Sequence, residues 1–453
     1  MIPITLQRVA DITGGVLYGA DTTISSISTD TRQMRTGSFF IALKGKHYDA
    51  HDFIQSAIDA GCAGLLISKS LHFKIPCVVV KNTRIALGDL AAWVRQQSNA
   101  RVVAITGSAG KTSVKDMTAA ILRHCGETLF TSGTLNNDIG VPITLLALHL
   151  RHRYVVLELG ASHVGEIAYT VQLTQPESVL INNLSPAHLE GFGSLSGIAK
   201  AKGEILDHLP LHGTAIINND SHDLANWKHV LKDRTIWRFS IHKINKSDFY
   251  ASDIAYSKSG AVFNLHSPKG SIGIALPLHG EHQIANALAA SALALSVGAP
   301  LNAIAMGLYH IKAIPGRLFP IYFSKYKLLI DDSYNANMGS MIAAIKVLSE
   351  RPGYRVMIVG DMAEMGNDAI LYHTQIGRLI HGAGINKVLS IGSLGMLIAR
   401  ESTVGECFKE HLSLGKRAYE LLTQHQPITL LVKGSRSSSM DKIVNILQEK
   451  GVC

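Results

Sequence analysis

Residues 102–113 read VVAITGSAGKTS, and this stretch decides the fold of the middle of the chain. An apolar run typical of a buried strand ends at Thr106, a glycine loop follows, and residues 113–126 have helical spacing. A strand, a glycine loop and a helix in this order are the context of a phosphate-binding loop. The usual pattern G-x-x-x-x-G-K-[ST] would place a glycine at position 105, where this chain has Ile105.

The loop predicts how a nucleotide phosphate is held. Backbone N–H groups at the start of a helix point at an anion, and the helix dipole favours negative charge there. The ammonium group of Lys111 would reach the terminal phosphates, and the hydroxyl group of Thr112 is placed to bind Mg²⁺. An ordinary glycine turn is the weaker alternative, because G-K-T lies between a strand and a helix. The predicted nucleotide-binding residues of the loop are Gly107, Ser108, Ala109, Gly110, Lys111, Thr112 and Ser113.

The sequence divides into three α/β blocks, since 453 residues are too many for one hydrophobic core. We expect short strands, among them residues 26–32 and 38–43, and one helix in residues 1–82. In residues 83–313 apolar strands alternate with helices, which predicts a central, largely parallel sheet, with a more β-rich stretch at 235–279. The alternation begins again in residues 314–453, which predicts a second parallel unit with ligand-binding loops at the carboxyl ends of its strands.

Composition narrows the class of protein and its compartment. No apolar run is long enough to span a membrane, and the start MIPITLQRVADITGG has no signal-peptide pattern. The five cysteines are scattered and form no C-x-x-C, which predicts reduced thiols in the cytoplasm. The net charge of +9 suits an anionic small substrate as well as nucleic acid. Since no run of five Lys or Arg residues occurs, we expect no nucleic-acid partner.

Single polar residues follow several of the expected strands. Glu158 ends the strand YVVLELG, where a carboxylate is either a Mg²⁺ ligand opposite the phosphate loop or a solvated strand end. His188 and Lys202, taken alone, fit an ordinary structural histidine and a solvated helix lysine. Asn286 lies in an alanine-rich helix and could read an adenine edge, while the Arg317 guanidinium could neutralise charge during phosphoryl transfer.

The loop T-G-x-x-G-K-[TS], without the first glycine, resembles that of the Mur ligases and the folylpolyglutamate synthetases. Both families make amide bonds at the expense of ATP. The resemblance implies three domains, namely a uridine-nucleotide-binding domain, a central ATPase-like domain and a C-terminal Rossmann-like domain. It further implies that Glu158 and His188 bind metal, and that Lys202 is carbamylated by CO₂ and binds metal too. For the nucleotide, it implies that Asn286 lies near the adenine, Arg317 near the γ-phosphate and Asp332 at the ribose.

Further motifs extend the resemblance over essentially the whole chain. STDTR and ALKGKHYDAHDF match the uridine-nucleotide domain of the later-acting Mur ligases, which implies that Thr31, Lys46 and His47 bind the UDP substrate. TLNNDIGVP matches the loop that meets the sugar-peptide, through Asn137. DDSYNAN begins the third block and implies that Asn335 and Asn337 contact the amine substrate.

The resemblance is strongest to the last-acting Mur ligase, and the D-N-P-R motif of the preceding ligase is absent. It implies a cytoplasmic, monomeric enzyme that uses ATP and two Mg²⁺ ions to join D-alanyl-D-alanine (D-Ala-D-Ala) to UDP-N-acetylmuramoyl-tripeptide in peptidoglycan precursor synthesis. A folylpolyglutamate synthetase-like ligase is the nearest alternative. A P-loop switch or transport NTPase fits less well, because Ile105 and Glu158 depart from its pattern. A nicotinamide enzyme is disfavoured, because no G-x-G-x-x-G follows a strand.

Overall fold

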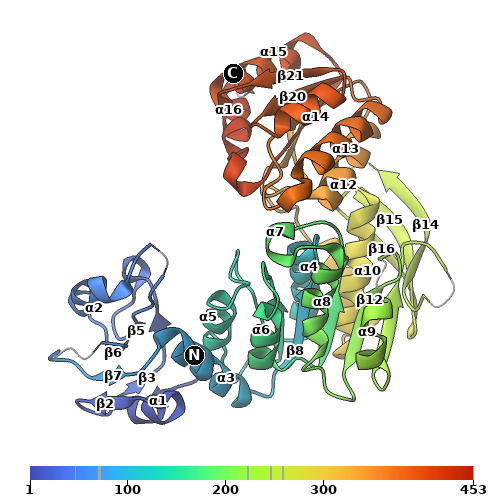
Figure 1. Cartoon of the computed structure of the whole chain (residues 1–453). Coiled ribbons are helices and arrows are strands. Elements are labelled where there is room, and N and C mark those ends of the chain that lie inside the picture. Colours follow the sequence, from blue (N-terminus) through green and yellow to red (C-terminus); the bar gives the residue numbers. More distant parts are fainter. Residues whose placement is uncertain (46, 70–72, 222–223, 245–246, 258–259, 452–453) are drawn as a thin grey trace.

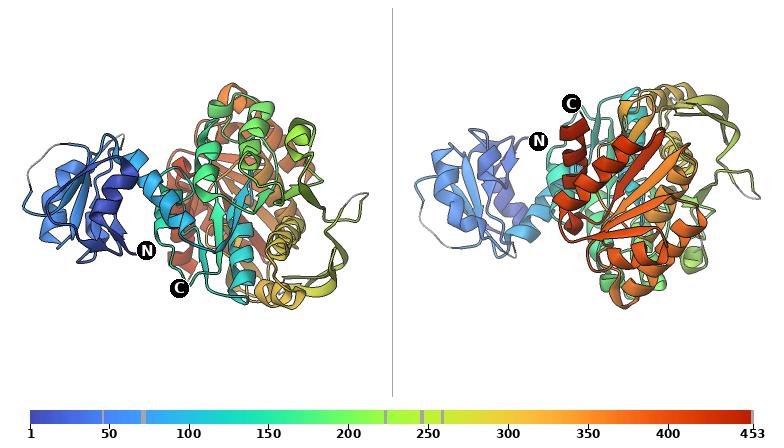
Figure 2. Two further views of the ribbon diagram at one scale, coloured as in Figure 1. Left: turned by 90° about the horizontal axis from the view of Figure 1, so that it is seen from below. Right: turned by 90° about the horizontal axis from the view of Figure 1, so that it is seen from above.

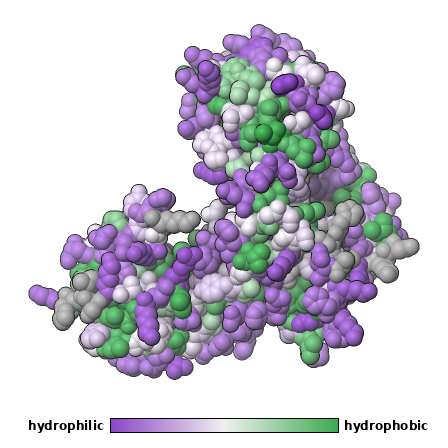
Figure 3. Space-filling view, in the orientation of Figure 1, coloured by the Kyte–Doolittle hydropathy of each residue, from purple (hydrophilic) through white to green (hydrophobic). Residues whose placement is uncertain are grey.

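The computed structural model describes residues 1–45, 47–69, 73–221, 224–244, 247–257 and 260–451, arranged in three lobes (Figure 1). The N-terminal lobe stands to one side of the central lobe, and the C-terminal lobe lies above the central one (Figures 1 and 2). The space-filling surface is hollowed between the N-terminal and C-terminal lobes (Figure 3). In the described part of the chain, no helix is long and apolar enough to cross a membrane.

The N-terminal lobe is built on a five-stranded sheet in the order β2-β7-β6-β5-β4. All neighbours in this sheet are parallel except β2 and β7. Its strands are β2 (Val16–Tyr18), β4 (Ile27–Ser28), β5 (Phe39–Ile41), β6 (Gly64–Ile67) and β7 (Cys77–Val79). The other elements are β1 (Ile4–Thr5), β3 (Thr23–Ile24), α1 (Leu6–Thr13), α2 (Ile54–Asp59) and the 3₁₀ helices Thr31–Gln33 and Ala50–Phe53.

The strand expected over residues 26–32 is shorter than predicted. Only β4 is extended, because the Asp30 side chain accepts a hydrogen bond from the Arg32 N–H and starts a 3₁₀ helix. Asp30 also forms an ion pair with the Arg32 guanidinium. Asp in this position favours turns over strands because its carboxylate competes for nearby backbone N–H groups.

Helix α3 (Thr83–Gln96) links the N-terminal lobe to the central lobe. Asn82 caps it by accepting hydrogen bonds from the N–H groups of Arg84 and Ile85. One continuous apolar core runs from Leu6 of the N-terminal lobe through Leu87 of α3 to Val102 of the central sheet. The two lobes are therefore packed together through this helix rather than joined by a loose linker.

The central lobe contains a six-stranded, fully parallel sheet in the order β13-β12-β11-β8-β10-β9. Its strands are β8 (Arg101–Thr106), β9 (Thr128–Phe130), β10 (Tyr154–Glu158), β11 (Ser178–Ile181), β12 (Thr214–Asn218) and β13 (Thr235–Phe239). Its helices are α4 (Lys111–Arg123), α5 (Gly140–Leu146), α6 (Glu166–Thr174), α7 (Leu189–Phe192), α8 (Leu195–Gly203), α9 (Leu224–Leu231), α10 (Glu281–Ser296) and α11 (Leu301–Tyr309), with a 3₁₀ turn at Glu204–Leu206.

Both faces of this sheet are buried, as the apolar strands predicted. Val102 and Ala104 of β8 face a core shared with α3, α5 and α6, whereas Val103 and Ile105 face a core shared with α4, α10 and α11. Residues 250–257 and 260–276 form part of the expected β-rich stretch, a three-stranded antiparallel sheet that packs on the second of these cores. Its strands are β14 (Tyr250–Ser257), β15 (Gly260–Ser267) and β16 (Gly270–Leu276).

The C-terminal lobe contains a six-stranded sheet in the order β17-β18-β22-β19-β20-β21, with only the edge strand β17 antiparallel. Its strands are β17 (Phe319–Ser324), β18 (Lys327–Asp332), β19 (Tyr354–Val359), β20 (Lys387–Ile391), β21 (Gly405–Phe408) and β22 (Ile428–Lys433). The helices are α12 (Met338–Ser349), α13 (Ala369–Gly382), α14 (Gly395–Glu401), α15 (His411–Gln424) and α16 (Asp441–Gly451), with 3₁₀ turns at Gly366–Asp368 and Arg436–Ser438. Helices on both faces of the sheet confirm the expected α/β fold.

Candidate active site

The phosphate loop connects β8 to α4 and needs glycine at two positions. Gly107 and Gly110 have φ angles of +149° and +78°, in the region that disfavours side chains. A Cβ atom at Gly110 would lie 2.6 Å from both the Asn182 Nδ2 and the Asn286 Oδ1. Ile105, in contrast, is fully buried in the sheet, so the position where the usual pattern has glycine belongs here to the strand and its core.

Lys111 begins α4 and folds back over the loop. Its Nζ donates a 2.8 Å hydrogen bond to the Gly107 carbonyl oxygen. Burial of the ammonium group lowers the pKa of Lys111, and the Glu158 carboxylate opposes that shift. The lysine is therefore held at the mouth of the loop, where its positive charge faces the place of the predicted phosphates.

Thr112 and Glu158 form the second feature of the loop. The Thr112 hydroxyl donates a 2.8 Å hydrogen bond to Glu158 Oε2, and Asn136 Nδ2 donates one of 2.8 Å to Oε1. Arg317 Nη2 in turn donates to the Thr112 Oγ1 at 2.9 Å. A hydroxyl and a carboxylate beside a phosphate loop are the oxygen ligands that Mg²⁺ prefers, so the donor set fits this ion. Within the described residues, no group of three or more His, Cys, Asp or Glu side chains is placed to hold a metal ion by itself.

Three asparagines fix the loop from β11 and α10. Asn183 accepts a hydrogen bond from the Ala109 N–H at 2.9 Å. Asn182 Nδ2 donates to the Ala109 carbonyl at 3.0 Å and to Asn286 Oδ1 at 3.2 Å. Asn286 is thereby tied to the loop, with Gln283 as its other partner. Asn182 and Asn183 were not predicted from the sequence, although both follow directly on the strand β11.

His188 directly precedes α7, and Lys202 lies in α8. His188 has a left-handed backbone, and its Nδ1 is paired with the Glu364 carboxylate of the C-terminal lobe. Lys202 is 2% exposed, and its Nζ lies 5.4 Å from the centre of the Phe192 ring. Burial, helped by the Lys111 charge, lowers the pKa of Lys202 to about 7. A buried amine that loses its proton this readily fits the nucleophile that CO₂ would carbamylate.

The C-terminal lobe contributes a buried ion pair and a helix start. Lys433 Nζ donates to Asp332 Oδ2 at 2.7 Å and to the Asn335 carbonyl at 2.9 Å. Asn337 caps α12, and its Nδ2 donates to the Ser108 carbonyl of the phosphate loop at 3.1 Å. The loop of residues 333–337, SYNAN, is thus held both to its own sheet and to the phosphate loop, and it is called the SYNAN loop below. Lys433 ends β22, where the sequence predicted a ligand-binding loop, but Lys433 itself was not predicted as a site residue.

Most of the residues described above line one cavity of about 490 Å³ between the central and C-terminal lobes. Fourteen of the predicted residues line it: Ser108, Ala109, Gly110, Lys111, Thr112, Ser113, Asn137, Glu158, His188, Asn286, Arg317, Asp332, Asn335 and Asn337. Gly107 and Lys202 are not among the lining residues, and Thr31 and His47 belong to the N-terminal lobe. Lys46 lies outside the described residues.

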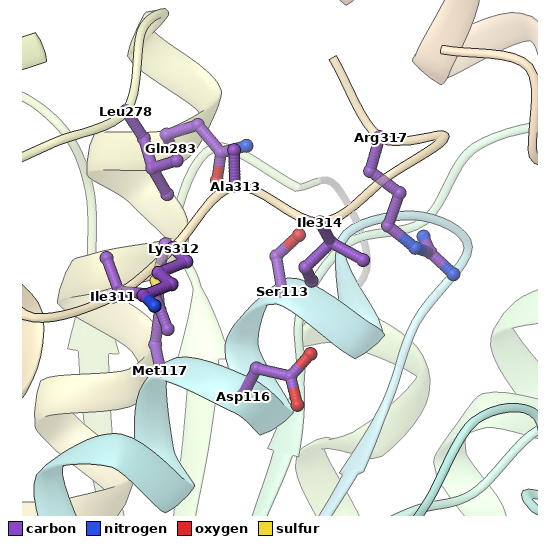
Figure 4. Close-up of a pocket in the computed structure, with 10 residues that line it drawn as sticks. All are labelled: Ser113, Asp116, Met117, Leu278, Gln283, Ile311, Lys312, Ala313, Ile314 and Arg317. Atoms are coloured by element: carbon purple, nitrogen blue, oxygen red, sulfur yellow. The ribbon is translucent and has the colours of Figure 1, made fainter. Parts of the chain in front are cut away.

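A second, much smaller pocket adjoins this cavity (Figure 4). The linker residues 311–314 pass over Met117 of α4 and Leu278, and the pocket of about 10 Å³ that they leave is too small for a nucleotide. Arg317 extends from the same linker, and both Arg317 and Gln283 line the two pockets. The linker is therefore part of the wall of the active-site cavity.

Comparisons with known proteins agree with this geometry. Three family models match the chain: "Mur ligase family, catalytic domain" over residues 23–103, "Mur ligase middle domain" over 105–294, and "Mur ligase, glutamate ligase domain" over 316–436. The UDP-N-acetylmuramoyl-tripeptide–D-alanyl-D-alanine ligase of Escherichia coli K12 is 55% identical over 453 residues, with 100% of both chains covered.

Two solved structures are also similar to the chain. A crystal structure of MurF from Acinetobacter baumannii has a TM-score of 0.93 at 37% identity and covers 99% of each chain. MurF from Thermotoga maritima, solved in complex with ADP, has the same fold, with a TM-score of 0.84 at 24% identity over 94% of this chain and 98% of that one. With family models over most of its length and a full-length relative at this identity, the chain belongs to the Mur ligase family.

Proposed function

We propose that the chain is the ATP-dependent ligase that adds D-Ala-D-Ala to UDP-N-acetylmuramoyl-tripeptide in peptidoglycan precursor synthesis. The full-length similarity to ligases of this name supports it. The observation that carries the proposal is a cavity that is lined both by the phosphate loop of the central lobe and by strand-end loops of the C-terminal lobe. A nucleotide and a second substrate can meet there, which an amide ligase requires and a P-loop switch does not.

The reaction needs two steps because a carboxylate resists attack by an amine. First, the terminal carboxylate oxygen of the tripeptide attacks the γ-phosphorus of ATP, which gives an acyl phosphate and ADP. The neutral amine of D-Ala-D-Ala then attacks the acyl carbon, phosphate leaves with the bridging oxygen, and the amine gives up a proton. The protein contributes mainly by positioning the reactants and by neutralising charge.

The charged residues of the cavity suit these tasks. We propose that Lys111 and Arg317 neutralise the negative charge that shifts between the phosphate groups during the first step. Thr112 and Glu158 would hold Mg²⁺, which supplies positive charge to the phosphate oxygens. His188 and a carbamylated Lys202 are the proposed protein ligands of a second ion. Carbamylation would turn the buried cation of Lys202 into an anion, which suits a metal site better than a bare ammonium group does.

The remaining substrate contacts are proposed by lobe. We assign residues 1–82 to the UDP-sugar, with Thr31, Lys46 and His47 as contacts, and residues 83–313 to ATP, with Asn137 near the sugar-peptide. The hollow beside the N-terminal lobe offers room for an extended nucleotide-linked peptide (Figure 3). Residues 314–453 would bring D-Ala-D-Ala, with Asn335 and Asn337 as contacts. The position of both asparagines in the cavity supports this assignment.

We also propose that the enzyme works as a monomer in the cytoplasm. The active-site cavity is lined by residues from two lobes of one chain, so a second copy is not needed to complete it. The four described cysteines form no disulfide, which suits a reducing compartment. ATP and UDP-linked precursors would meet the enzyme there.

Phosphate release against a panel of UDP-linked peptides tests the function. We expect release that depends on ATP, on a UDP-tripeptide and on D-Ala-D-Ala, with a UDP-pentapeptide as product. Glutamate with a folate should support no release. ATP hydrolysis that needs neither peptide nor dipeptide, or ligation of glutamate to a folate, would contradict the proposal and favour a switch NTPase or a folylpolyglutamate synthetase.

A further inference from the structure

Glu364 of the C-terminal lobe reaches across to His188 of the central lobe. It lies on the loop that follows β19, in the sequence DMAEMG, and its carboxylate pairs with His188 Nδ1. The Glu364 carbonyl also accepts a hydrogen bond from the Glu190 N–H at 3.3 Å. Helix α7, which follows His188, lies on the side of the central lobe that faces the C-terminal lobe (Figure 1). The two loops therefore meet at a side chain and at the backbone.

Both partners hold unusual backbone conformations. His188 has a φ of +53° and Glu364 a φ of +59°, and neither is glycine. The left-handed region costs an ordinary residue on the order of 1 kcal/mol or more, so it persists only where the surroundings impose it. Here it is imposed on two residues that touch each other. Strain that is concentrated at one contact points to a role for the contact itself.

Packing fixes the two loops together. Leu189 and Phe192 of α7 belong to the core of the C-terminal lobe, where Met362 and Met365 flank Glu364 in the sequence and are almost fully buried. The Phe192 ring lies edge-on to His188, with 6.4 Å between the ring centres, and also faces the Lys202 ammonium group. The Glu364 loop is thus packed against the segment that carries the proposed ligands of the second metal ion.

From these contacts we infer that Glu364 is a positioning residue that orients the His188 ring for metal binding from the neighbouring lobe. A carboxylate that accepts the Nδ1–H of a histidine fixes the tautomer and leaves Nε2 free to bind a metal. His188 lines the active-site cavity, so a ring held in this way presents its other nitrogen to the site. The inference rests on the proposed role of His188 as a ligand.

Docking of the C-terminal lobe would then precede completion of the second metal site. Because the carboxylate belongs to the lobe that is proposed to bring the amine, the second metal site is complete only when that lobe is docked. An undocked lobe would leave the His188 ring without its partner. A simple surface ion pair is the competing explanation, since the Glu364 side chain is 50% exposed and such pairs contribute little to stability.

Binding of Mn²⁺ as a substitute for Mg²⁺ distinguishes these explanations. The full-length protein is titrated with Mn²⁺ in the presence of the ATP analogue AMPPCP and the UDP-tripeptide, and free Mn²⁺ is followed by electron paramagnetic resonance. We expect Glu364→Gln and Glu364→Ala to lower the Mn²⁺ affinity of the lower-affinity class of sites by about 10- to 100-fold. This is the usual effect of losing a residue that orients a metal ligand. Glu364→Asp should recover part of the loss. Glu190→Gln removes the same charge from the adjoining helix α7 and should leave Mn²⁺ binding unchanged.

Two further measurements separate positioning from stability. The affinity for metal-free ADP and the thermal unfolding midpoint of Glu364→Gln should match those of the unsubstituted protein. If Mn²⁺ affinity is unchanged in Glu364→Gln, or if ADP affinity and the midpoint fall together with it, the inference is wrong. His188→Ala tests the underlying assignment: if it too leaves Mn²⁺ binding intact, the ligand role of His188 fails, whereas a loss in His188→Ala alone refutes only the role of Glu364.

Discussion

Arg317 and Thr112 are 205 positions apart in the sequence, yet the Arg317 guanidinium donates a 2.9 Å hydrogen bond to the Thr112 hydroxyl. Arg317 lies on the linker between the central and C-terminal lobes, and Thr112 lies in the first turn of α4. The Arg317 guanidinium also stacks over the Tyr334 ring, 4.3 Å from its centre. One side chain therefore joins the linker, the phosphate loop and the SYNAN loop.

Arg317→Lys should slow ligation by about 10²- to 10³-fold, the range found when one charge-stabilising group is lost. Lysine keeps the charge but lacks the planar fork that reaches Thr112 and Tyr334 together. Turnover is measured by phosphate release, and the fold is checked by circular dichroism. Arg378→Lys is the matched control, because Arg378 forms an ion pair with Glu401 at the surface. Equal turnover in both variants would remove Arg317 from the phosphate site.

Lys202 should carry a carbamate in the active protein. Its buried amine has a pKa lowered to about 7, so the neutral form that attacks CO₂ becomes more abundant as the pH rises through that value. Incubation with ¹³C-bicarbonate should give a carbamate signal in the ¹³C spectrum that grows over this range. Lys200→Ala should keep the signal and Lys202→Ala should lose it. A signal and full activity in Lys202→Ala would show that the assignment is wrong.

The N-terminal lobe should bind the UDP substrate independently of ATP. Thr31 lies in the 3₁₀ turn after β4, and Lys46 belongs to the GKHYD segment. Thr31→Val and Lys46→Ala should weaken binding of the UDP-tripeptide in calorimetry, because a hydroxyl and a cation suited to the nucleotide are lost. ATP affinity should stay the same. A parallel loss of ATP affinity would indicate misfolding and not a lost contact.

The two asparagines of the SYNAN loop should behave differently. Asn335→Ala should raise the Michaelis constant for D-Ala-D-Ala far more than that for ATP, if this loop meets the amine. Asn337→Ala should also destabilise the protein by roughly 1 kcal/mol, because the side chain caps α12. Asn337→Asp preserves the cap and loses only the hydrogen bond to Ser108. Unaltered kinetics in Asn335→Ala and Asn337→Asp would exclude the loop from the amine site.

The sequence predicted the parts of the fold that depend on strong periodicity. The apolar runs at β8, β10, β11 and β22 mark strands buried on both faces, and each of them is a strand in the structure. The strands β9, β17 and β21 were missed. They lie at or near sheet edges, where β9 has only three residues and β17 is half exposed, so their apolar pattern is weak.

The site residues that were predicted from the sequence are those whose residue type and motif together indicate a chemical role. Lys111, Thr112 and Glu158 were identified in this way, and the structure brings all three together. Lys433, Asn182 and Glu364 act through partners more than 70 positions away, and no local pattern reveals such partners. The N-terminal contacts depend on resemblance alone, because the active-site cavity does not extend to Thr31 or His47. Their roles stay predictions.

Transfer of a labelled oxygen atom tests the acyl-phosphate mechanism, the central claim, most directly. The UDP-tripeptide is prepared with ¹⁸O in its terminal carboxylate and incubated with the enzyme, ATP, Mg²⁺ and D-Ala-D-Ala. Mass spectrometry of the released phosphate should find a single ¹⁸O atom for each amide bond formed, because the carboxylate oxygen becomes the bridge of the acyl phosphate and leaves with phosphorus. Phosphate without ¹⁸O, released while the amide product accumulates, would contradict the mechanism.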